Sequence, residues 1–481
     1  MNRFGKRFSL LLTIIFLITA SLQLSQGQQT KEMKAGVWLT SVDKSALFEK
    51  QDQPLRFVSA DHHHHNNDAP VITINPDQTY QEMEGFGYTL TGGSALWISE
   101  MSEAARAELL RELFTTEGDG IGVSYLRVSI GSSDLDPYVF SYSDLPEGET
   151  DPEMEQFSLE PDKAYLIPVL KEILELVPDI PILGSPWSPP TWMKSNRSSI
   201  GGSLLPEHYD AYALYFVRYV EEMAREGVTI DAITVQNEPL HPGNNPSLLM
   251  KADEQAEFIK NHLGPAFKEH GVDTKIIIYD HNLDRIDYPL DVLDDPDAAK
   301  YVHGTAFHLY GGEIDSMSKV HLQHPDKKLY FTEQWVGANS EFSDNFPWHM
   351  QELMIGAPRN WSRNVLQWNL VSNPDLEPHT DGGCTLCLGG VTIDGDQVTR
   401  NDAYYFIAHA SKFVRPGSVR VYSTESAALP NVAYKRSDGA TVLLVFNPSE
   451  TVTTFRVQSE GKTALTEIPP VSAATIVWGV D

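Results

Sequence analysis

The sequence predicts an α/β fold: a (β/α)8 TIM barrel with an associated β-sandwich domain built from both chain ends. From about residue 79 to residue 415, apolar strand-like runs alternate with helical segments, as they do in a parallel barrel. After residue 415 the pattern changes to short strands separated by turn residues. Two of the barrel runs end in a glutamate, at Glu238 and Glu333. Because the carboxyl ends of barrel strands form the mouth of the barrel, we expect both side chains there.

Residues 1–27 have the pattern of a cleaved export signal. Arg3, Lys6 and Arg7 precede an apolar run from Phe8 to Leu24, which is interrupted by hydroxyl residues and followed by Gln-rich sequence. A membrane anchor is the alternative, but the polar interruptions favour cleavage. We therefore expect an exported chain, periplasmic or extracellular, without stable membrane insertion once the signal is removed.

Residues 28–78 are expected to contribute N-terminal strands to the β-sandwich, from the runs Gly36–Thr40 and Val71–Ile74. Between these runs stand four consecutive histidines, His62–His65. Such a run can bind metal, although an exposed polar loop is the more common structure. The catalytic barrel is assigned to residues 79–415 and the C-terminal part of the sandwich to residues 416–481.

The chain is strongly acidic, with a formal net charge of −30 and an isoelectric point of about 4.8. An acidic surface repels phosphate backbones, so nucleic acid is excluded as a partner. A neutral carbohydrate meets no such repulsion. The nine Trp and nineteen Tyr residues also offer flat faces against which a sugar ring can pack.

The two cysteines, Cys384 and Cys387, stand in a Gly-rich segment. A local disulfide is the favoured interpretation in an exported chain. A redox C-x-x-C motif lacks its usual βαβ surroundings here, and a zinc half-site lacks a second cysteine pair.

The barrel elements follow in order along the chain. Gly85–Ser94 is expected to form a strand and a tight turn, without the Gly-Lys-Ser/Thr sequence of a phosphate loop. The hydrophobic spacing predicts helices at residues 102–115, 163–176, 209–226 and 402–413. Strands are expected at residues 123–130, 181–185, 233–235, 276–281, 304–310, 328–333 and 365–370.

Several polar and aromatic residues lie on these predicted strands or directly after them. Arg127 is inside a strand, where an unpaired charge is costly, so its partner is a catalytic carboxylate, a substrate hydroxyl or a structural ion pair. Trp187 and Trp192 lie in a Pro-rich loop whose fixed shape can present their faces to a ligand, with core packing as the alternative for one of them. His308 and Tyr310 share one face of their strand.

The spacing of the two glutamates suits a catalytic pair. Glu238 and Glu333 are 95 residues apart, or about three β/α units, which fits strands four and seven of a barrel. Those strand ends face each other across the mouth. Two such glutamates are what a glycosidase needs, because one protonates the leaving oxygen and the other attacks the anomeric carbon. A single glutamate after a strand would more commonly be a solvated loop residue.

The chain resembles glycoside hydrolase family 30, which includes glucosylceramidases and endo-β-1,6-glucanases. The resemblance covers nearly the whole chain after the signal. It rests on the segments Gly85–Gly87, Leu126–Val128, Ser185–Lys194, Asn237–Pro239, His308–Tyr310, Thr332–Glu333, Trp368–Leu370 and Ser411–Gly417.

The resemblance implies a retaining mechanism with Glu238 as acid/base and Glu333 as nucleophile. It implies a subsite for the attacked sugar that is lined by Arg127, Trp187, Asn237, His308, Tyr310 and Trp368. Neither a cofactor nor a metal is expected. The mechanism also leads us to expect a raised pKa for the acid in the free enzyme.

The expected substrate is a β-glucan, cleaved as by an endo-β-1,6-glucanase. Glucosylceramidases carry a sugar-binding Asp shortly after the Gly-Phe-Gly segment, and we align that position with Gly92; Asp134 is a candidate replacement. Glucosylceramidase, β-glucosidase and β-xylosidase activities are the alternatives within the family. Outside it, the alternatives are a non-catalytic sugar-binding barrel and a disulfide oxidoreductase that uses Cys384 and Cys387.

Overall fold

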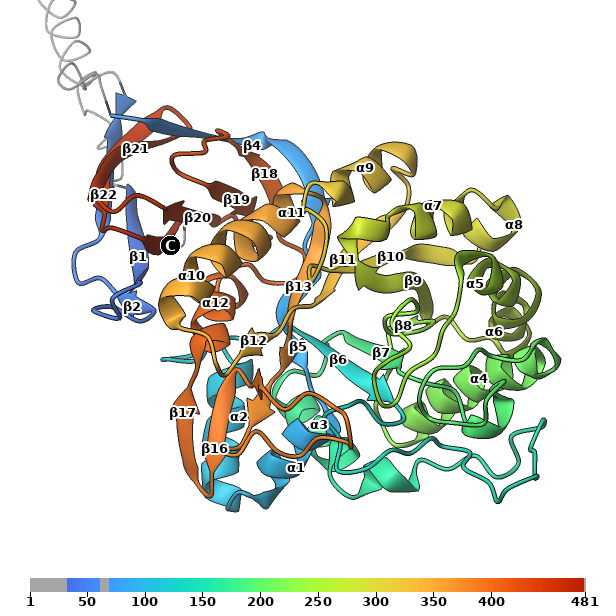
Figure 1. Ribbon diagram of the computed structural model, residues 1–481. Coiled ribbons are helices and arrows are strands. Elements are labelled where there is room, and N and C mark those ends of the chain that lie inside the picture. Colours follow the sequence, from blue (N-terminus) through green and yellow to red (C-terminus); the bar gives the residue numbers. More distant parts are fainter. Residues whose placement is uncertain (1–32, 61–68, 480–481) are drawn as a thin grey trace, which may run out of the picture.

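The computed structural model describes residues 33–60 and 69–479. The predicted export signal and the run His62–His65 lie outside the described residues. The described chain forms a barrel with surrounding helices and, beside it, a β domain in which the two ends of the chain meet (Figure 1).

The predicted barrel is confirmed. Eight parallel strands close on themselves in the order β10-β11-β13-β5-β6-β7-β8-β9. Glu238 follows the fourth of these strands along the chain and Glu333 ends the seventh, as the spacing predicted. The strands are β5 (Gly85–Thr89), β6 (Tyr125–Ile130), β7 (Ile182–Pro186), β8 (Ala232–Thr234), β9 (Lys275–Asn282), β10 (Val302–His308), β11 (Lys328–Glu333) and β13 (Ser362–Asn369).

Each barrel strand is followed by helical segments that cover its outer face (Figure 1). Ser102 caps one of them by accepting a hydrogen bond from the backbone N–H of Ala105, as expected of a helix-starting serine. The helices are α1 (Gly92–Glu100), α2 (Glu103–Phe114), α3 (Leu166–Leu176), α4 (Tyr209–Arg225), α5 (Ala252–Phe258), α6 (Gly264–His270), α7 (Asp287–Leu293), α8 (Pro296–Ala299), α9 (Ser316–Gln323), α10 (Phe342–Trp348), α11 (Ala357–Arg359) and α12 (Asp402–Ser411).

The base of the barrel is filled by one layer of apolar side chains. Its members come from β6, β7, β8, β9, β10, β11 and β13, and they are Tyr125, Leu183, Ala232, Ile277, Ala306, Tyr330 and Leu366. All are buried. This layer closes the lower end of the barrel, so a ligand can enter only from the carboxyl ends of the strands.

The β domain is a single ten-stranded sheet that curls until its edges meet. β1 pairs with β23 and also with β3, which in turn pairs with β22, so strands from both chain ends enclose one apolar core. Its strands are β1 (Met33–Ser41), β2 (Glu49–Lys50), β3 (Leu55–Ser59), β4 (Val71–Glu82), β18 (Val419–Ser423), β19 (Asn431–Lys435), β20 (Thr441–Asn447), β21 (Thr453–Ser459), β22 (Lys462–Ile468) and β23 (Ser472–Trp478). β2, β3 and β22 were not predicted from the sequence.

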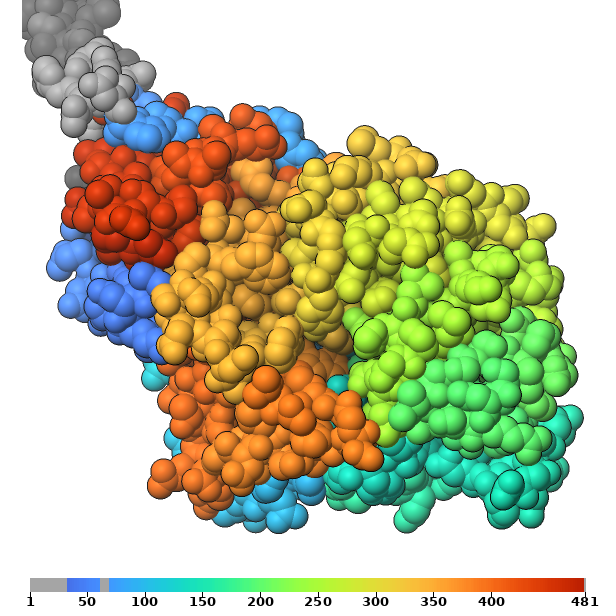
Figure 2. Space-filling view, viewed as in Figure 1, coloured from blue at the N-terminus to red at the C-terminus, as the bar shows by residue number. Residues whose placement is uncertain are grey.

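The β domain is fixed to the barrel through α12. His409 on that helix is fully buried, and its two ring nitrogens lie 2.8 Å from the hydroxyls of Thr40 on β1 and Thr475 on β23. In the space-filling view, the blue N-terminal and red C-terminal segments form one continuous body beside the barrel (Figure 2). Within residues 33–60 and 69–479, no helix is long and apolar enough to cross a membrane.

Candidate active site

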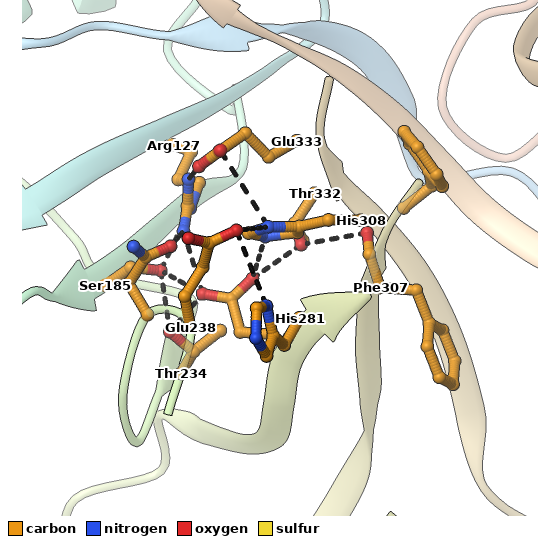
Figure 3. A network of polar contacts seen from close by, with 12 residues as sticks. Arg127, Ser185, Thr234, Glu238, His281, Phe307, His308, Thr332 and Glu333 are labelled. Atoms are coloured by element: carbon orange, nitrogen blue, oxygen red, sulfur yellow. Dashed lines mark hydrogen bonds and ion pairs between the residues drawn. The ribbon is translucent and has the colours of Figure 1, made fainter. Parts of the chain in front are cut away.

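A polar layer lies directly above the apolar layer of the barrel. Because side chains alternate along a strand, the residue two positions beyond each apolar layer member also points inward, one level closer to the mouth. Here this rule brings a set of buried side chains together: Arg127, Ser185, Thr234, His308, Thr332 and Trp368. The polar atoms of Arg127, Ser185, Thr234, His308 and Thr332 meet in one connected network (Figure 3), whereas the Trp368 ring lies beside it.

Asp280 joins this layer through a β-bulge. The pairing of β9 with β10 shifts register so that Ala306 lies opposite Tyr279 and Phe307 lies opposite His281, which leaves Asp280 as the extra residue. Tyr279 and Asp280 both have positive φ angles, of 71° and 62°. The bulge therefore turns the Asp280 carboxylate into the barrel, where strict alternation would have placed Tyr279.

Arg127 is the centre of the network. Its guanidinium donates to Glu333 Oε2 at 2.6 Å, to Asn237 Oδ1 at 2.7 Å, to Asp280 Oδ2 at 2.8 Å and to Ser185 Oγ at 3.1 Å. The side chain is completely buried. A buried guanidinium is stable only when its donors are satisfied, and here two carboxylates and two neutral oxygens satisfy them. The predicted pairing of Arg127 with the carboxylate of Glu333 is thus observed.

The Glu238 segment leaves β8 in a strained but well-anchored conformation. The φ angle of Glu238 is +46°, an unusual value for a residue with a side chain. Its backbone N–H donates to the carbonyl of Asp280 at 3.0 Å, and the N–H of Asn237 donates to the carbonyl of Pro186 at 2.8 Å. These bonds to neighbouring strands hold both side chains at the barrel mouth.

Two imidazoles stand beside the Glu238 carboxylate. Its Oε1 atom lies 3.1 Å from Nδ1 of His308 and 3.4 Å from Nδ1 of His281. Burial favours a high pKa for Glu238, but these two imidazoles outweigh burial and hold the pKa of Glu238 well below its usual range. The expectation of a raised pKa in the free enzyme was therefore wrong, because no local pattern indicates that two histidines converge on this carboxylate.

His308 carries the complementary shift. Burial alone would lower the pKa of its imidazole, but the surrounding carboxylates of Glu333, Asp280 and Glu238 raise that pKa to about 10. Its Nε2 atom is 3.1 Å from Oδ1 of Asp280, which fixes the ring orientation. The hydroxyl of Tyr310 donates to Oε1 of Glu333 at 2.9 Å. One cluster in the described part of the chain has ligand atoms that lie within 4.8 Å of one another, which is close enough to hold a metal ion. Its members are Glu238, His281 and His308.

A cavity of about 200 Å³ opens above this network. Trp187 and Trp368 pack against each other in its wall, with ring centroids 5.3 Å apart. The guanidinium carbon of Arg127 lies 4.9 Å from the centroid of the Trp187 ring, which steadies that ring from behind. The cavity is lined by Asp134, Trp187, Asn237, Glu238, Asn244, Tyr310, Glu333, Trp335, Trp368, Cys384 and Cys387.

Two predicted site residues do not line the cavity. Arg127 and His308 were expected in the subsite wall, but both are fully buried behind it and direct their polar atoms at carboxylates. The Arg127 and His308 donors already bond to protein oxygens. Arg127 and His308 therefore act on the barrel mouth indirectly, by holding the carboxylates of Glu333 and Glu238. The other predicted residues, namely Trp187, Asn237, Tyr310 and Trp368, do line the cavity together with the two glutamates.

The structure shows what surrounds Gly92. This glycine begins α1 and lies against Asp136: a Cβ atom at position 92 would be 1.7 Å from Oδ1 of Asp136. The carboxylate of Asp136 therefore occupies the space that a side chain at position 92 would need. Asp134, in contrast, lies in the cavity wall, where burial and the negative charge of Glu333 raise its pKa to about 7.

The loop that carries the two cysteines closes one side of the cavity. Cys384 and Cys387 are joined by a disulfide, and both line the cavity. The backbone N–H of Cys384 donates to Oδ2 of Asp134 at 3.2 Å. The next strand segment, β15 (Cys387–Leu388), pairs with β12 (Val336–Gly337), which directly follows the Glu333 strand. The loop therefore connects Asp134 with the segment after Glu333.

Residues 83–414 match the model of the glycosyl hydrolase family 30 TIM-barrel domain, and residues 417–476 match that of the family 30 β-sandwich domain. The chain belongs to glycosyl hydrolase family 30. It is 33% identical over 449 residues to an endo-1,6-β-D-glucanase of Neurospora crassa, covering 89% of this chain and 91% of that protein. It is 30% identical over 446 residues to the lysosomal acid glucosylceramidase of Mus musculus, covering 85% and 83%. A solved structure of an endo-β1,6-glucanase superposes with a TM-score of 0.85 and 33% identity, over 93% of this chain and 99% of that one.

Four residues of this family 30 site were not singled out as site residues from the sequence: Asp280, His281, Asn244 and Trp335. For Asp280 and His281 a signal existed, since they end the apolar run Ile276–Tyr279 as Glu238 and Glu333 end theirs. Trp335 follows Glu333 by two residues. Asn244 stands in an irregular segment whose path to the cavity no local pattern reveals.

Proposed function

We propose that the chain is a retaining glycoside hydrolase that cleaves β-1,6-glucan internally, with Glu333 as nucleophile and Glu238 as acid/base. The observation that carries the proposal is the meeting of these two carboxylates at the barrel mouth, in the wall of one cavity. The further support comes from their separation, from the groups that hold each of them, and from the relatives named above.

The separation of the carboxylates is compatible with retention. Nδ1 of His308 lies 3.1 Å from Oε1 of Glu238 and 3.8 Å from Oε1 of Glu333. The two oxygens are therefore at most about 7 Å apart. Retaining enzymes hold their carboxyl groups about 5–5.5 Å apart, whereas inverting enzymes need about 6.5–9.5 Å to place a water molecule between the sugar and the base.

Glu333 is held as a nucleophile should be. Arg127 donates to Oε2 and the Tyr310 hydroxyl donates to Oε1, so both carboxylate oxygens are fixed in direction. One of them would attack the anomeric carbon as the bond to the leaving oxygen breaks, which gives a covalent glycosyl ester. Water then attacks the same carbon and releases the sugar with its original configuration.

The acid/base is a pair of groups in this proposal. The low pKa of Glu238 and the raised pKa of His308 place the proton of the resting enzyme on the imidazole, 3.1 Å from the carboxylate oxygen. His308 Nδ1 would therefore first pass its proton to Glu238, and Glu238 would deliver that proton to the leaving oxygen. In the second step the Glu238 carboxylate accepts the proton of the attacking water.

Asn237 would contribute a contact to the reacting sugar. Its side-chain oxygen accepts from Arg127 at 2.7 Å, which fixes the amide orientation and leaves the NH₂ group for the cavity that Asn237 lines. A donor at that position can bond the 2-hydroxyl, an interaction that strengthens as positive charge develops on the ring.

The choice of β-1,6-glucan rests on the relatives. The fungal enzyme and the solved structure, each 33% identical to this chain, are both endo-1,6-β-glucanases. The mouse glucosylceramidase, at 30% identity, favours glucosylceramide as the second candidate substrate. Asp134 in the cavity wall suits either, because a carboxylate there can accept hydrogen bonds from glucosyl hydroxyls.

The deciding experiment is product analysis on linear β-1,6-glucan, with glucosylceramide and an aryl β-xyloside in parallel. Mixed gluco-oligosaccharides from the polymer, released as the β-anomer in early NMR spectra, are expected. Release from a small glycoside alone would replace the endo-glucanase assignment with an exo-glycosidase. Oligosaccharide binding by calorimetry without any product would instead support a non-catalytic sugar-binding barrel.

Two variants test the roles of the glutamates. Glu333→Ala is expected to abolish turnover, and near-wild-type hydrolysis by this variant would refute the nucleophile assignment. Glu238→Ala should retain burst formation of the glycosyl enzyme on substrates with an activated leaving group, since such a group needs no acid in the first step while the second step loses its base. Export belongs to the same proposal, and sequencing the mature N-terminus should find it near residue 28.

A further inference from the structure

Glu238, His281 and His308 offer three metal-ligand atoms at the edge of the cavity (Figure 3). Oε1 of Glu238 is 3.1 Å from Nδ1 of His308 and 3.4 Å from Nδ1 of His281. Ligand bonds of about 2.0–2.1 Å in a tetrahedral zinc site put neighbouring ligand atoms about 3.3 Å apart. Both measured separations match that spacing, and the two histidine nitrogens lie within 4.8 Å of each other.

Among the described residues, Nδ1 of His281 faces no polar partner other than the Glu238 carboxylate. His281 is 7% exposed, and within the described part of the chain its Nδ1 atom has no well-formed hydrogen bond. A buried ring nitrogen normally finds a partner, because an unmade hydrogen bond is costly. This nitrogen instead faces the Glu238 carboxylate at 3.4 Å, a distance that suits a shared cation.

The surroundings of the three ligands also favour a cation. Zinc binding would displace the proton that His308 carries in the resting enzyme. Once both imidazoles are neutral, the carboxylates of Glu238, Asp280 and Glu333 outnumber the single guanidinium of Arg127, which contacts two of them. Asp280 Oδ1 is 3.1 Å from Nε2 of His308, the nitrogen that faces away from Glu238. A carboxylate that orients a histidine ligand in this way is a common feature of metal sites.

We propose that Glu238, His281 and His308 form a binding site for Zn²⁺, with the fourth position open to the cavity. Two imidazoles and one carboxylate are a donor set that zinc accepts readily. Bound zinc would occupy the carboxylate of Glu238 and the imidazole of His308, the two groups that move the proton. Zinc would therefore inhibit hydrolysis reversibly. That inhibitory consequence rests on the proposed function, whereas zinc binding itself does not.

The test measures binding directly, by titrating the full chain with Zn²⁺ against a chromophoric chelator at pH 8. The background variant has all four of His62–His65 replaced by Gln, because that run offers imidazoles of its own. One equivalent of zinc is expected to bind, and His281→Gln in this background should weaken that binding at least tenfold. His324→Gln is the matched control, since His324 lies 3.1 Å from the single carboxylate of Asp294, and it should bind zinc like the background.

Two further measurements distinguish the loss of a zinc ligand from misfolding of the His281→Gln variant. Co²⁺ added to the background protein should give the intense visible absorption of a four-coordinate ion, and thermal melts should show that His281→Gln is folded. Absence of stoichiometric zinc binding in the background protein, or equal zinc affinity in folded His281→Gln, would overturn the proposal.

Turnover separates the two proposals. The background enzyme should be active in EDTA, inhibited by zinc and restored by excess chelator. No turnover in EDTA together with intact zinc binding would count against the proposed function alone. Turnover that is insensitive to saturating zinc would show that the bound ion lies elsewhere and would refute the site.

Discussion

Replacing Arg127 by Met removes the positive charge from the centre of the polar layer and keeps most of the side-chain length. Two carboxylates, Asp280 and Glu333, then lose the donor that lies 2.8 Å and 2.6 Å from them. Neither can be rescued by bulk water, because Asp280 is fully buried and the Glu333 side chain is only 9% exposed. The variant therefore leaves uncompensated negative charge inside the barrel.

The expected loss of stability is large. Removing one partner of a buried ion pair costs about 3–5 kcal/mol. We expect the upper part of this range for Arg127→Met, because one guanidinium serves two carboxylates and also Asn237. The matched control is Arg225→Met. Arg225 is 59% exposed and pairs with Glu221 and Glu222 on the surface of α4, so about 0.5 kcal/mol or less is expected there.

Urea unfolding followed by tryptophan fluorescence measures both variants, since Trp187 lies directly against the Arg127 guanidinium. The reasoning would be refuted by an Arg127→Met loss below about 1 kcal/mol, or by losses of equal size in the two variants. Hydrolysis should also fall in Arg127→Met at temperatures where the variant remains folded, because Glu333 Oε2 is no longer held.

Three other predictions follow from the site and its support. Asn237→Ala should lower kcat/KM on β-1,6-glucan by about 100-fold, as expected for a sugar contact worth several kcal/mol in the transition state. Steady-state kinetics measure this change, and an unchanged kcat/KM would show that the contact does not exist. The double variant Cys384→Ser/Cys387→Ser should raise KM for β-1,6-glucan more than it lowers kcat, because the disulfide loop holds Asp134 and forms part of the cavity wall. Complete loss of activity in this double variant, together with full activity in Glu333→Ala, would favour the disulfide oxidoreductase instead. Burial raises the pKa of Asp162 to about 8. The folded state therefore keeps a proton that the unfolded state releases above about pH 4. The free energy of unfolding should fall as the pH rises from about 4 to about 8. Asp162→Asn should make that decline shallower by about 1.4 kcal/mol per pH unit between pH 5 and 7, and parallel curves in urea unfolding would contradict the assignment.

Much of the barrel was predictable because each of its strands is a short apolar run with a clear end. That pattern located the strands that carry Arg127, Glu238, His308 and Glu333, and the spacing of the two glutamates gave their strand numbers. The β-sandwich was predictable from turn residues, except for β2, β3 and β22: β2 has only two residues, and exposed and buried residues alternate weakly in β3 and β22.

The interior of the site was harder to predict, because it depends on backbone irregularity. Asp280 enters the polar layer only through a bulge in β9, which no propensity reveals. The low pKa of Glu238 depends on two histidines from neighbouring strands, and the sequence shows neither their direction nor their distance.

The meeting of both chain ends in one sheet has a consequence for how the protein is made. β1 pairs with β23 from Ala35 to Ser41, and the paired residues Ser41 and Ser472 are 431 positions apart. At about 5–20 residues per second, a ribosome delivers the second partner about 20–90 seconds after the first. Until then β1 and β4 present open strand edges, and the β domain cannot close. The β domain can therefore close only after β23 has been synthesised. A chain that stops before Ser472 leaves one edge of β1 unpaired and accessible to chaperones and proteases.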